Sequence, residues 1–305
     1  MGTQASIKYP ETLGFDAVTD LKVRLVRGHV DVVGTDGPPR VEVHEIEGDP
    51  LVVTEEDGRL EVGYEDLGSV FDFESMSGKE ALQGLGEALR DLLHEGRTGR
   101  AQEWVGRFSW FGRRRRAVVS IAVPRQCPVR VNVVSASAVV AGLDSQAKVK
   151  SVSGDITLDG LSGAVDAHTV SGALEAQGLA ATLSFATTSG DLTVVEATSE
   201  RIEGHTVSGD LTADLDLADN GKVGLGSVSG DVTVRLGEST GATVRAFTTS
   251  GNTSSGFDGL HTQRSPGKRS IEGVLGDGRG RVEVKTVSGD VHLLRRQRAT
   301  GKATA

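Results

Sequence analysis

The chain has 305 residues, with 41 glycines, one cysteine and a formal net charge of −9. This length is enough for a sizeable core, the lone Cys127 excludes an internal disulfide, and the acidic balance excludes a general nucleic-acid binder. No signal-peptide apolar region occurs in residues 1–10, and no apolar run reaches the roughly 20 residues of a membrane-spanning helix. We therefore expect a cytoplasmic protein.

The first predicted elements are strands between residues 13 and 65. Alternating apolar residues in 21–26, 29–34, 41–44 and 60–62 indicate half-buried strands. We interpret residues 1–70 as an N-terminal part that contributes the first, less regular rungs of a β-stack.

Residues 71–117 interrupt the strand pattern. Ser77 and Glu80 have the spacing of a capping box, leucines then follow one helical stripe, and Gly96 is placed to end the helix. Residues 97–116 hold seven arginines and several large aromatics. The sequence therefore predicts a short helical, Arg- and aromatic-rich insertion.

The insertion has three interpretations. It could cap an open end of the stack, contact an anionic membrane surface through aromatics and arginines, or bind a protein partner or a second copy. The predicted contact residues are Trp104, Arg107, Phe108, Trp110, Phe111, Arg113, Arg114, Arg115 and Arg116.

A motif of the form V/T-S-G-D/N/A repeats through residues 118–295. Its serines are Ser153, Ser171, Ser189, Ser208, Ser229, Ser250 and Ser288, spaced 18 to 21 residues apart until a final step of 38. We expect Ser270 to mark a degenerate repeat inside that long step and Ser135 to mark one repeat before Ser153. Residues 296–305 are predicted to be a disordered tail.

Each repeat is predicted to contain a turn followed by a strand. The residue before the serine and those three and five positions after it are mostly apolar, so we expect them to face inward. The glycines are interpreted as structural turn residues that allow a sharp bend with positive φ; they are Gly154, Gly172, Gly190, Gly209, Gly230, Gly251 and Gly289.

A unit this short cannot bury its own apolar face, so neighbouring units are expected to stack. The predicted fold class is all-β, a β-solenoid or single-stranded β-helix-like stack of 18–21-residue rungs with the insertion described above. An antiparallel sandwich is the alternative, because it also has strands every 8–12 residues.

Few residues of the chain suggest chemistry. The repeated aspartates, such as Asp191 and Asp210, are interpreted as turn caps, with a calcium column as the alternative. His168 and His205 are predicted to lie at the surface, and Cys127 to be a buried small residue. We find no zinc motif and no catalytic constellation, so we predict no enzyme activity, cofactor or metal.

The motif T-V-S-G-D-[VIL]-T-[VL], the half-repeat at 159–163 and the strand–Gly–strand stretch at 15–34 resemble a bacterial β-strand-repeat family of toast-rack or adhesin domains. The resemblance covers about 13–65 and 118–295. It implies a non-catalytic β-solenoid associated with cell-envelope stress systems and membrane-stress regulators.

Three functions follow as hypotheses. The first is a scaffold or sensor module, cytoplasmic and peripheral to the membrane, whose partner is a protein or an anionic membrane surface. The second is a self-assembling structural protein of the bactofilin kind. The third, a carbohydrate-active β-helix enzyme, usually requires clustered carboxylates, which we do not find in the sequence.

Overall fold

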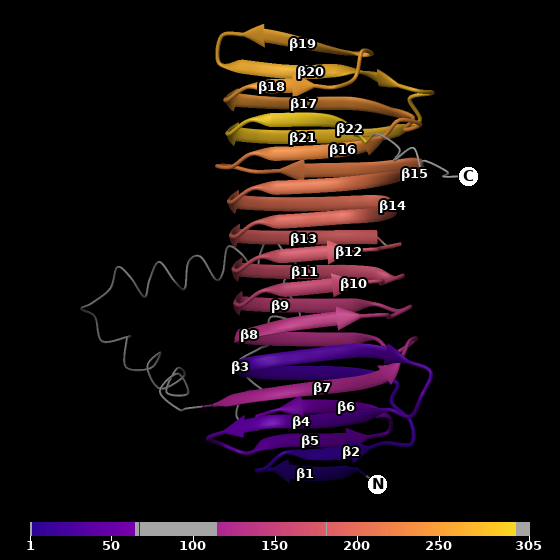
Figure 1. The fold of residues 1–305 in the computed structure, drawn as a ribbon, viewed down its shortest axis with the longest axis vertical. Helices are drawn as coiled ribbons and strands as arrows, with labels where there is room; N and C mark the ends of the chain where they lie inside the picture. Colours follow the sequence, from indigo (N-terminus) through magenta and orange to yellow (C-terminus); the bar gives the residue numbers. More distant parts are fainter. Residues whose placement is uncertain (1, 65–66, 68–114, 181, 297–305) are drawn as a thin grey trace, which may run out of the picture. The chain divides into compact units, whose positions relative to one another are not determined.

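The computed structural model describes residues 2–64, 67, 115–180 and 182–296. These residues form β-strands joined by turns (Figure 1), which confirms the all-β class. The predicted helix and most of the insertion lie outside the described residues. The strands belong to two compact units: unit 1 consists of Met1–Asp159 and Asp166–Gly172, and unit 2 of Gly160–Val165 and Ala173–Ala305.

Unit 1 is built from two ladders of hydrogen-bonded strands. Its strands are β1 (Thr3–Ile7), β2 (Glu11–Gly14), β3 (Asp20–Thr35), β4 (Arg40–Glu47), β5 (Leu51–Glu56), β6 (Arg59–Gly63), β7 (Arg116–Pro124), β8 (Val129–Ala141), β9 (Ala147–Ser153), β10 (Ile156–Asp159) and most of β11 (Ala164–Ser171). In the first ladder β9, β8, β3 and β6 are parallel, and β5 and β1 follow antiparallel. In the second, β10, β8, β3 and β7 are parallel, and β4 and β2 follow antiparallel.

Strand β3 shows why one segment can serve both ladders of unit 1. Alternate residues are buried in its first half, from Leu21 to Leu25, and again in its second half at Val30 and Val32. Between these runs lies Gly28 with a φ of 120°, a conformation that other residues rarely adopt. Both halves of β3 run parallel to β8. In this N-terminal part β3 is thus parallel to β7 and β8, whereas β4 and β5 pair antiparallel with their neighbours.

Unit 2 also contains two ladders. Its strands are β12 (Leu174–Gln177), β13 (Thr182–Ser189), β14 (Leu192–Ser208), β15 (Leu211–Gly226), β16 (Val232–Gly237), β17 (Ala242–Ser250), β18 (Thr253–Ser255), β19 (Leu260–Ser265), β20 (Lys268–Leu275), β21 (Gly280–Ser288) and β22 (Val291–Arg296). The first ladder runs β13, β14, β15, β21 and β17 in parallel, followed by the antiparallel β20 and β19. The second runs β12, β14, β15, β16, β22 and β18, all parallel.

The core of unit 2 lies between the buried faces of its two ladders. Apolar side chains alternate with exposed ones along β14, β15 and β21, as the period-2 pattern predicts. Gly204 in the first ladder lies directly against the side chains of Leu192 and Leu211 in the second. The two ladders thus bury one another's apolar faces.

The order of strands in unit 2 differs from their order in the sequence. Strand β21 lies between β15 and β17, and β22 lies between β16 and β18; Figure 1 shows these yellow strands among orange ones. The expectation that each repeat stacks on its predecessor is therefore wrong for the Ser250 motif, which neighbours the Ser288 motif instead of the Ser229 motif. Ser270 is not a motif serine, because it pairs antiparallel with Phe247 in the sheet that contains the β19–β20 hairpin.

Candidate functional site

The motif glycines lie in columns where neighbouring rungs approach closely. At six of them an added Cβ would lie 2.6–2.8 Å from a backbone carbonyl carbon of the adjacent rung, and nearer still to its oxygen; these are Gly154, Gly172, Gly209, Gly230, Gly251 and Gly289. Only Gly172, Gly209 and Gly230 of the predicted turn glycines have positive φ. Close approach, rather than a positive φ at every turn, is therefore the requirement that these six positions share.

The motif aspartates connect successive rungs of unit 2. Asp191 Oδ1 accepts the backbone N–H of Asp210, and Asp210 Oδ1 accepts that of Asp231, both at 2.9 Å. The Asp231 carboxylate accepts the N–H of Asp290, and the Asp290 carboxylate that of Asn252, both at 2.7 Å. The predicted capping role is confirmed, but each carboxylate caps the next rung. No group of acidic, His or Cys side chains suited to a metal occurs within the described ranges.

A column of buried hydroxyl groups, two residues before each motif serine, was missed by the sequence prediction. Its members are Ser151, Thr169, Thr187, Thr206, Ser227, Thr248 and Thr286. Thr248 donates to the carbonyl of Gly289 at 2.8 Å, and Thr286 donates to that of Gly230 at 3.2 Å. The signal was present in the sequence, since a Ser or Thr stands at this position in every repeat.

The residue directly before the motif serine faces outward, which corrects the predicted inward orientation. Val207, Val228 and Val287 are 46–51% exposed. They lie on adjacent rungs, because the N–H of Ser229 bonds to the Val207 carbonyl and that of Ser288 to the Val228 carbonyl. The strand alternation is intact, but the buried position belongs to the preceding hydroxyl residue.

Histidines take part in two kinds of polar contact in unit 1. His168 is 7% exposed, which contradicts its predicted surface position, and its Nε2 lies 2.5 Å from the Asp166 carboxylate. Burial disfavours the charged Asp166, but hydrogen bonding and charge from His168, with Lys150 and Lys148, outweigh this and lower the pKa of Asp166. His205 is exposed, as predicted.

A second polar network crosses the outer face of β3, β7 and β4. Ser120 Oγ lies 2.9 Å from His44 Nε2 and donates to Asp31 at 3.4 Å, while the Asp31 carboxylate lies 2.7 Å from His29 Nε2. In a Ser-His-Asp triad the carboxylate orients the histidine that contacts the serine. Here Asp31 contacts the serine and a different histidine, so this network does not have the connectivity of a triad.

Cys127 is buried, as predicted. The residue is 2% exposed, and burial, followed by the charge of Asp20, raises the pKa of its thiol to about 12. A thiol held protonated in this way is a poor nucleophile, because the thiolate is the reactive form. Cys127 therefore serves as packing in unit 1.

Two of the predicted contact residues fall within the described part of the chain. Arg115 is 2% exposed, donates to Asp49 at 2.8 Å and lies 5.1 Å from the centre of the Tyr64 ring. Burial raises the pKa of Tyr64 to about 12 against the opposing charge of Arg115. Arg115 is thus a buried residue that packs within unit 1, whereas Arg116 is exposed and pairs with Glu45 at 2.7 Å.

The remaining predicted contact residues lie outside the described residues: Trp104, Arg107, Phe108, Trp110, Phe111, Arg113 and Arg114. On either side of these residues, Arg115 stacks on Tyr64, so the described residues that flank the insertion contact each other. None of the described residues forms a helix that is long and apolar enough to cross a membrane.

Parallel ladders whose rungs repeat a Ser-Gly-Asp turn define this chain as an all-β repeat protein. The Toastrack DUF4097 family model matches residues 105–294, which is more than half of the chain. The chain therefore belongs to this family, and the resemblance noted in its sequence is confirmed. No curated protein matches it.

Solved structures are similar to this chain at low identity. A candidate cell adhesion protein from Clostridium sporogenes is 12% identical over 94% of this chain and 99% of its own, with a TM-score of 0.26. A candidate adhesin from Bacteroides fragilis is 10% identical over 94% of this chain and 98% of its own, with a TM-score of 0.42. A candidate lipid-binding protein from Parabacteroides distasonis is 11% identical over 94% of this chain and 97% of its own, with a TM-score of 0.35.

Proposed function

We propose that this chain is a non-catalytic β-solenoid that acts as a scaffold or sensor module at the cytoplasmic face of the membrane, in a cell-envelope stress system. The observation that carries the proposal is the in-register stacking of parallel rungs. Leu192 pairs with Leu211, Leu211 with Val232 and Val232 with Val291, each at the same motif position. A sandwich of antiparallel strands would not require such columns.

The contacts of the repeated polar residues support a structural role for the motif. The repeated aspartates accept backbone N–H groups of the next rung, and the Thr248 and Thr286 hydroxyls donate to glycine carbonyls. Such bonds satisfy backbone groups at the turn edge. These repeated aspartates and threonines thus hold rungs together.

The insertion supports the proposed contact with an anionic membrane surface. The described residues that flank it, Tyr64 and Arg115, contact each other, and Arg115 also pairs with Asp49. Arginines attract anionic headgroups, and Trp and Phe favour the interfacial layer. The link to envelope stress rests on what the family resemblance implies.

Self-assembly of the bactofilin kind has less support. In unit 1 both ladders end in strands that are antiparallel to their neighbours, β1 and β2. In unit 2 the first ladder ends likewise in β19, whereas the second ends in the parallel β18. Joining copies through open parallel rungs would use parallel end strands, and only β18 among these four ends is paired in parallel. We therefore favour the scaffold over the filament.

Sedimentation with vesicles tests the proposal. We expect the full chain to sediment with phosphatidylglycerol-containing vesicles but not with pure phosphatidylcholine vesicles, and less so at high salt. Replacing residues 68–113 with a short Gly-Ser linker should abolish sedimentation while retaining the fold, because the flanking residues Tyr64 and Arg115 are already in contact.

A matched variant controls for charge alone. Arg201→Ala with Arg281→Ala removes two exposed arginines from other strands and should leave sedimentation unchanged. Unaltered vesicle binding after deletion of the segment, or equal binding to phosphatidylcholine, would show that the membrane contact is wrong.

A further inference from the structure

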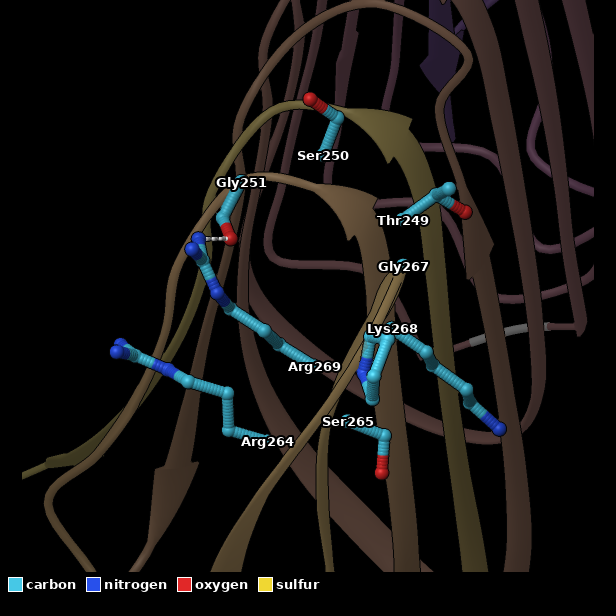
Figure 2. Close-up of a pocket in the computed structure, with 9 residues that line it drawn as sticks. Thr249, Ser250, Gly251, Arg264, Ser265, Gly267, Lys268 and Arg269 are labelled. Carbon is cyan, nitrogen blue, oxygen red and sulfur yellow. Dashed lines mark hydrogen bonds between the residues drawn. The ribbon is translucent and has the colours of Figure 1, made fainter.

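An open hollow of about 520 Å³ lies at the tip of the β19–β20 hairpin, beside the end of β17 (Figure 2). Three of the side chains around it are cationic, those of Arg264, Lys268 and Arg269, and the hydroxyls of Thr249, Ser250 and Ser265 also line it. No acidic residue of the described ranges lines the hollow. It is therefore a basic feature on an acidic protein.

The two arginines are cross-strand partners. Arg264 pairs with Arg269 in the antiparallel hairpin, and Figure 2 shows both side chains extending to the same side, whereas Lys268 extends the other way. Like charges directly opposite one another destabilise a strand pair. An anion bound between the two guanidinium groups would remove this repulsion.

The three cations have no acidic partner among the described residues. Within the described residues, no carboxylate pairs with Arg264, Lys268 or Arg269, whereas exposed arginines elsewhere do pair, as Arg201 does with Glu203 at 2.6 Å. Lys268 lies 4.9 Å from the centre of the Phe247 ring. Among the described residues, therefore, no ion pair neutralises the positive charge around the hollow.

Arg269 is positioned by neutral groups that leave much of its guanidinium available. Its Nη1 donates to the carbonyl of Gly251 and, at 2.9 Å, to Asn252 Oδ1. Both bonds use the same nitrogen, so Nε and Nη2 can still donate to a ligand. A guanidinium fixed in this way is prepared for fork-like recognition of an oxyanion.

We propose that this hollow is a binding site for a phosphoryl group, held between Arg264 and Arg269. A phosphate carries a charge of about −1.5 to −2 at neutral pH and three acceptor oxygens, which suits several cations and nearby hydroxyls better than a single carboxylate would. The volume falls in the range of small-molecule sites, so it has room for an organic group attached to the phosphate. This site goes beyond the proposed scaffold function and uses none of the residues of the insertion.

Calorimetric titration of the full chain with inorganic phosphate tests the site. We expect saturable binding that Arg264→Gln weakens by about tenfold or more, the equivalent of losing one charge-assisted hydrogen bond. Arg264 has no protein partner whose loss would disturb the fold within the described residues. Arg269→Gln should weaken binding similarly, and Arg201→Gln, which removes the same charge from another strand, should not.

Vesicles containing phosphatidic acid distinguish the two sources of a phosphoryl group. Arg264-dependent binding to inorganic phosphate supports a soluble ligand, and Arg264-dependent binding to the vesicles alone supports a lipid headgroup. Because the insertion is intact in both proteins compared, its own vesicle binding cancels from the comparison. Absence of binding to either probe up to about 10 mM phosphate, or equal weakening by Arg201→Gln, would overturn the site.

Discussion

Individual residues at the turn edge determine how closely the rungs can stack. Gly230 has a φ of 152°, and a Cβ there would lie 2.7 Å from the carbonyl carbon of Gly209. Real side chains do not approach backbone so closely, so any larger residue forces the rungs apart. Whether such a position accepts a larger side chain therefore depends on the adjacent rung rather than on its own strand.

We therefore predict that Gly230→Ala lowers the free energy of unfolding by about 3 kcal/mol or more, from overpacking and backbone strain together. Gly224→Ala is the matched control on β15, because a Cβ added there would have no atom within 4 Å and the φ of Gly224 is not positive. That substitution should be neutral or stabilising. Urea denaturation measures both, and equal effects would contradict the close-approach explanation.

The sequence analysis attributed these glycines to turns with positive φ, which is only part of the reason that glycine is required there. A repeated Gly suggests positive φ, which Gly154 and Gly251 do not have. Close contact with a neighbouring rung depends on which residues become neighbours, and a single sequence does not contain that information. For the same reason the polar network of Ser120, His44 and Asp31 could not be predicted, since its members come from three strands.

Two members of the column of buried hydroxyl groups join neighbouring strands of unit 2. Thr286 and Thr248 donate to carbonyls of adjacent rungs, whereas the buried Thr206 hydroxyl has no acceptor among the described residues. A buried polar group without a partner costs about 1–3 kcal/mol. Removing a hydroxyl that has an acceptor should therefore destabilise the fold, whereas removing one that has no acceptor should stabilise it.

We predict that Thr206→Val raises the free energy of unfolding by about 1 kcal/mol, because it removes an unsatisfied group at similar volume. Thr286→Val should lower it by a similar amount, because the Gly230 carbonyl loses a donor. Chemical denaturation of both variants against the wild type gives the comparison. Destabilisation of equal size in both would mean that Thr206 does have a bonding partner.

Strand positions were well predicted wherever the repeat is regular. The motif serines do align between rungs, as the Ser208–Ser229 and Ser229–Ser288 pairings show. The hairpin around Ser270 was mistaken for a repeat because its length matches one period. Antiparallel and parallel strands share the same period-2 pattern, so periodicity alone could not distinguish them.

At the scale of the whole molecule, each unit combines parallel ladders with antiparallel end strands, and unit 2 places its last strands in the interior of a ladder. In β21 and β22, Val282, Val284, Val291 and Leu293 are fully buried. Each such side chain contributes about 1.5–3 kcal/mol of burial free energy. These strands also provide the parallel partners of β17 and β18.

Truncation tests this arrangement. We predict that a chain ending at residue 279 loses cooperative unfolding of unit 2, because β17–β20 is left without its parallel neighbour. A chain ending at residue 296 should unfold like the wild type. Circular dichroism in urea measures both, and a cooperative transition of unchanged midpoint in the shorter chain would contradict the strand order. In an array stacked in chain order, removing the last repeat would leave its predecessors intact.

The interior position of β21 and β22 also has a consequence during synthesis. A ribosome adds about 5–20 residues each second, so β15 and β17 emerge seconds before the segment that must fit between them. During that interval the edges of β15 and β17 that will later pair with β21 are unpaired. Unpaired strand edges can pair with other chains. Folding of this protein in the cell should therefore depend on factors that shield strand edges near the ribosome exit.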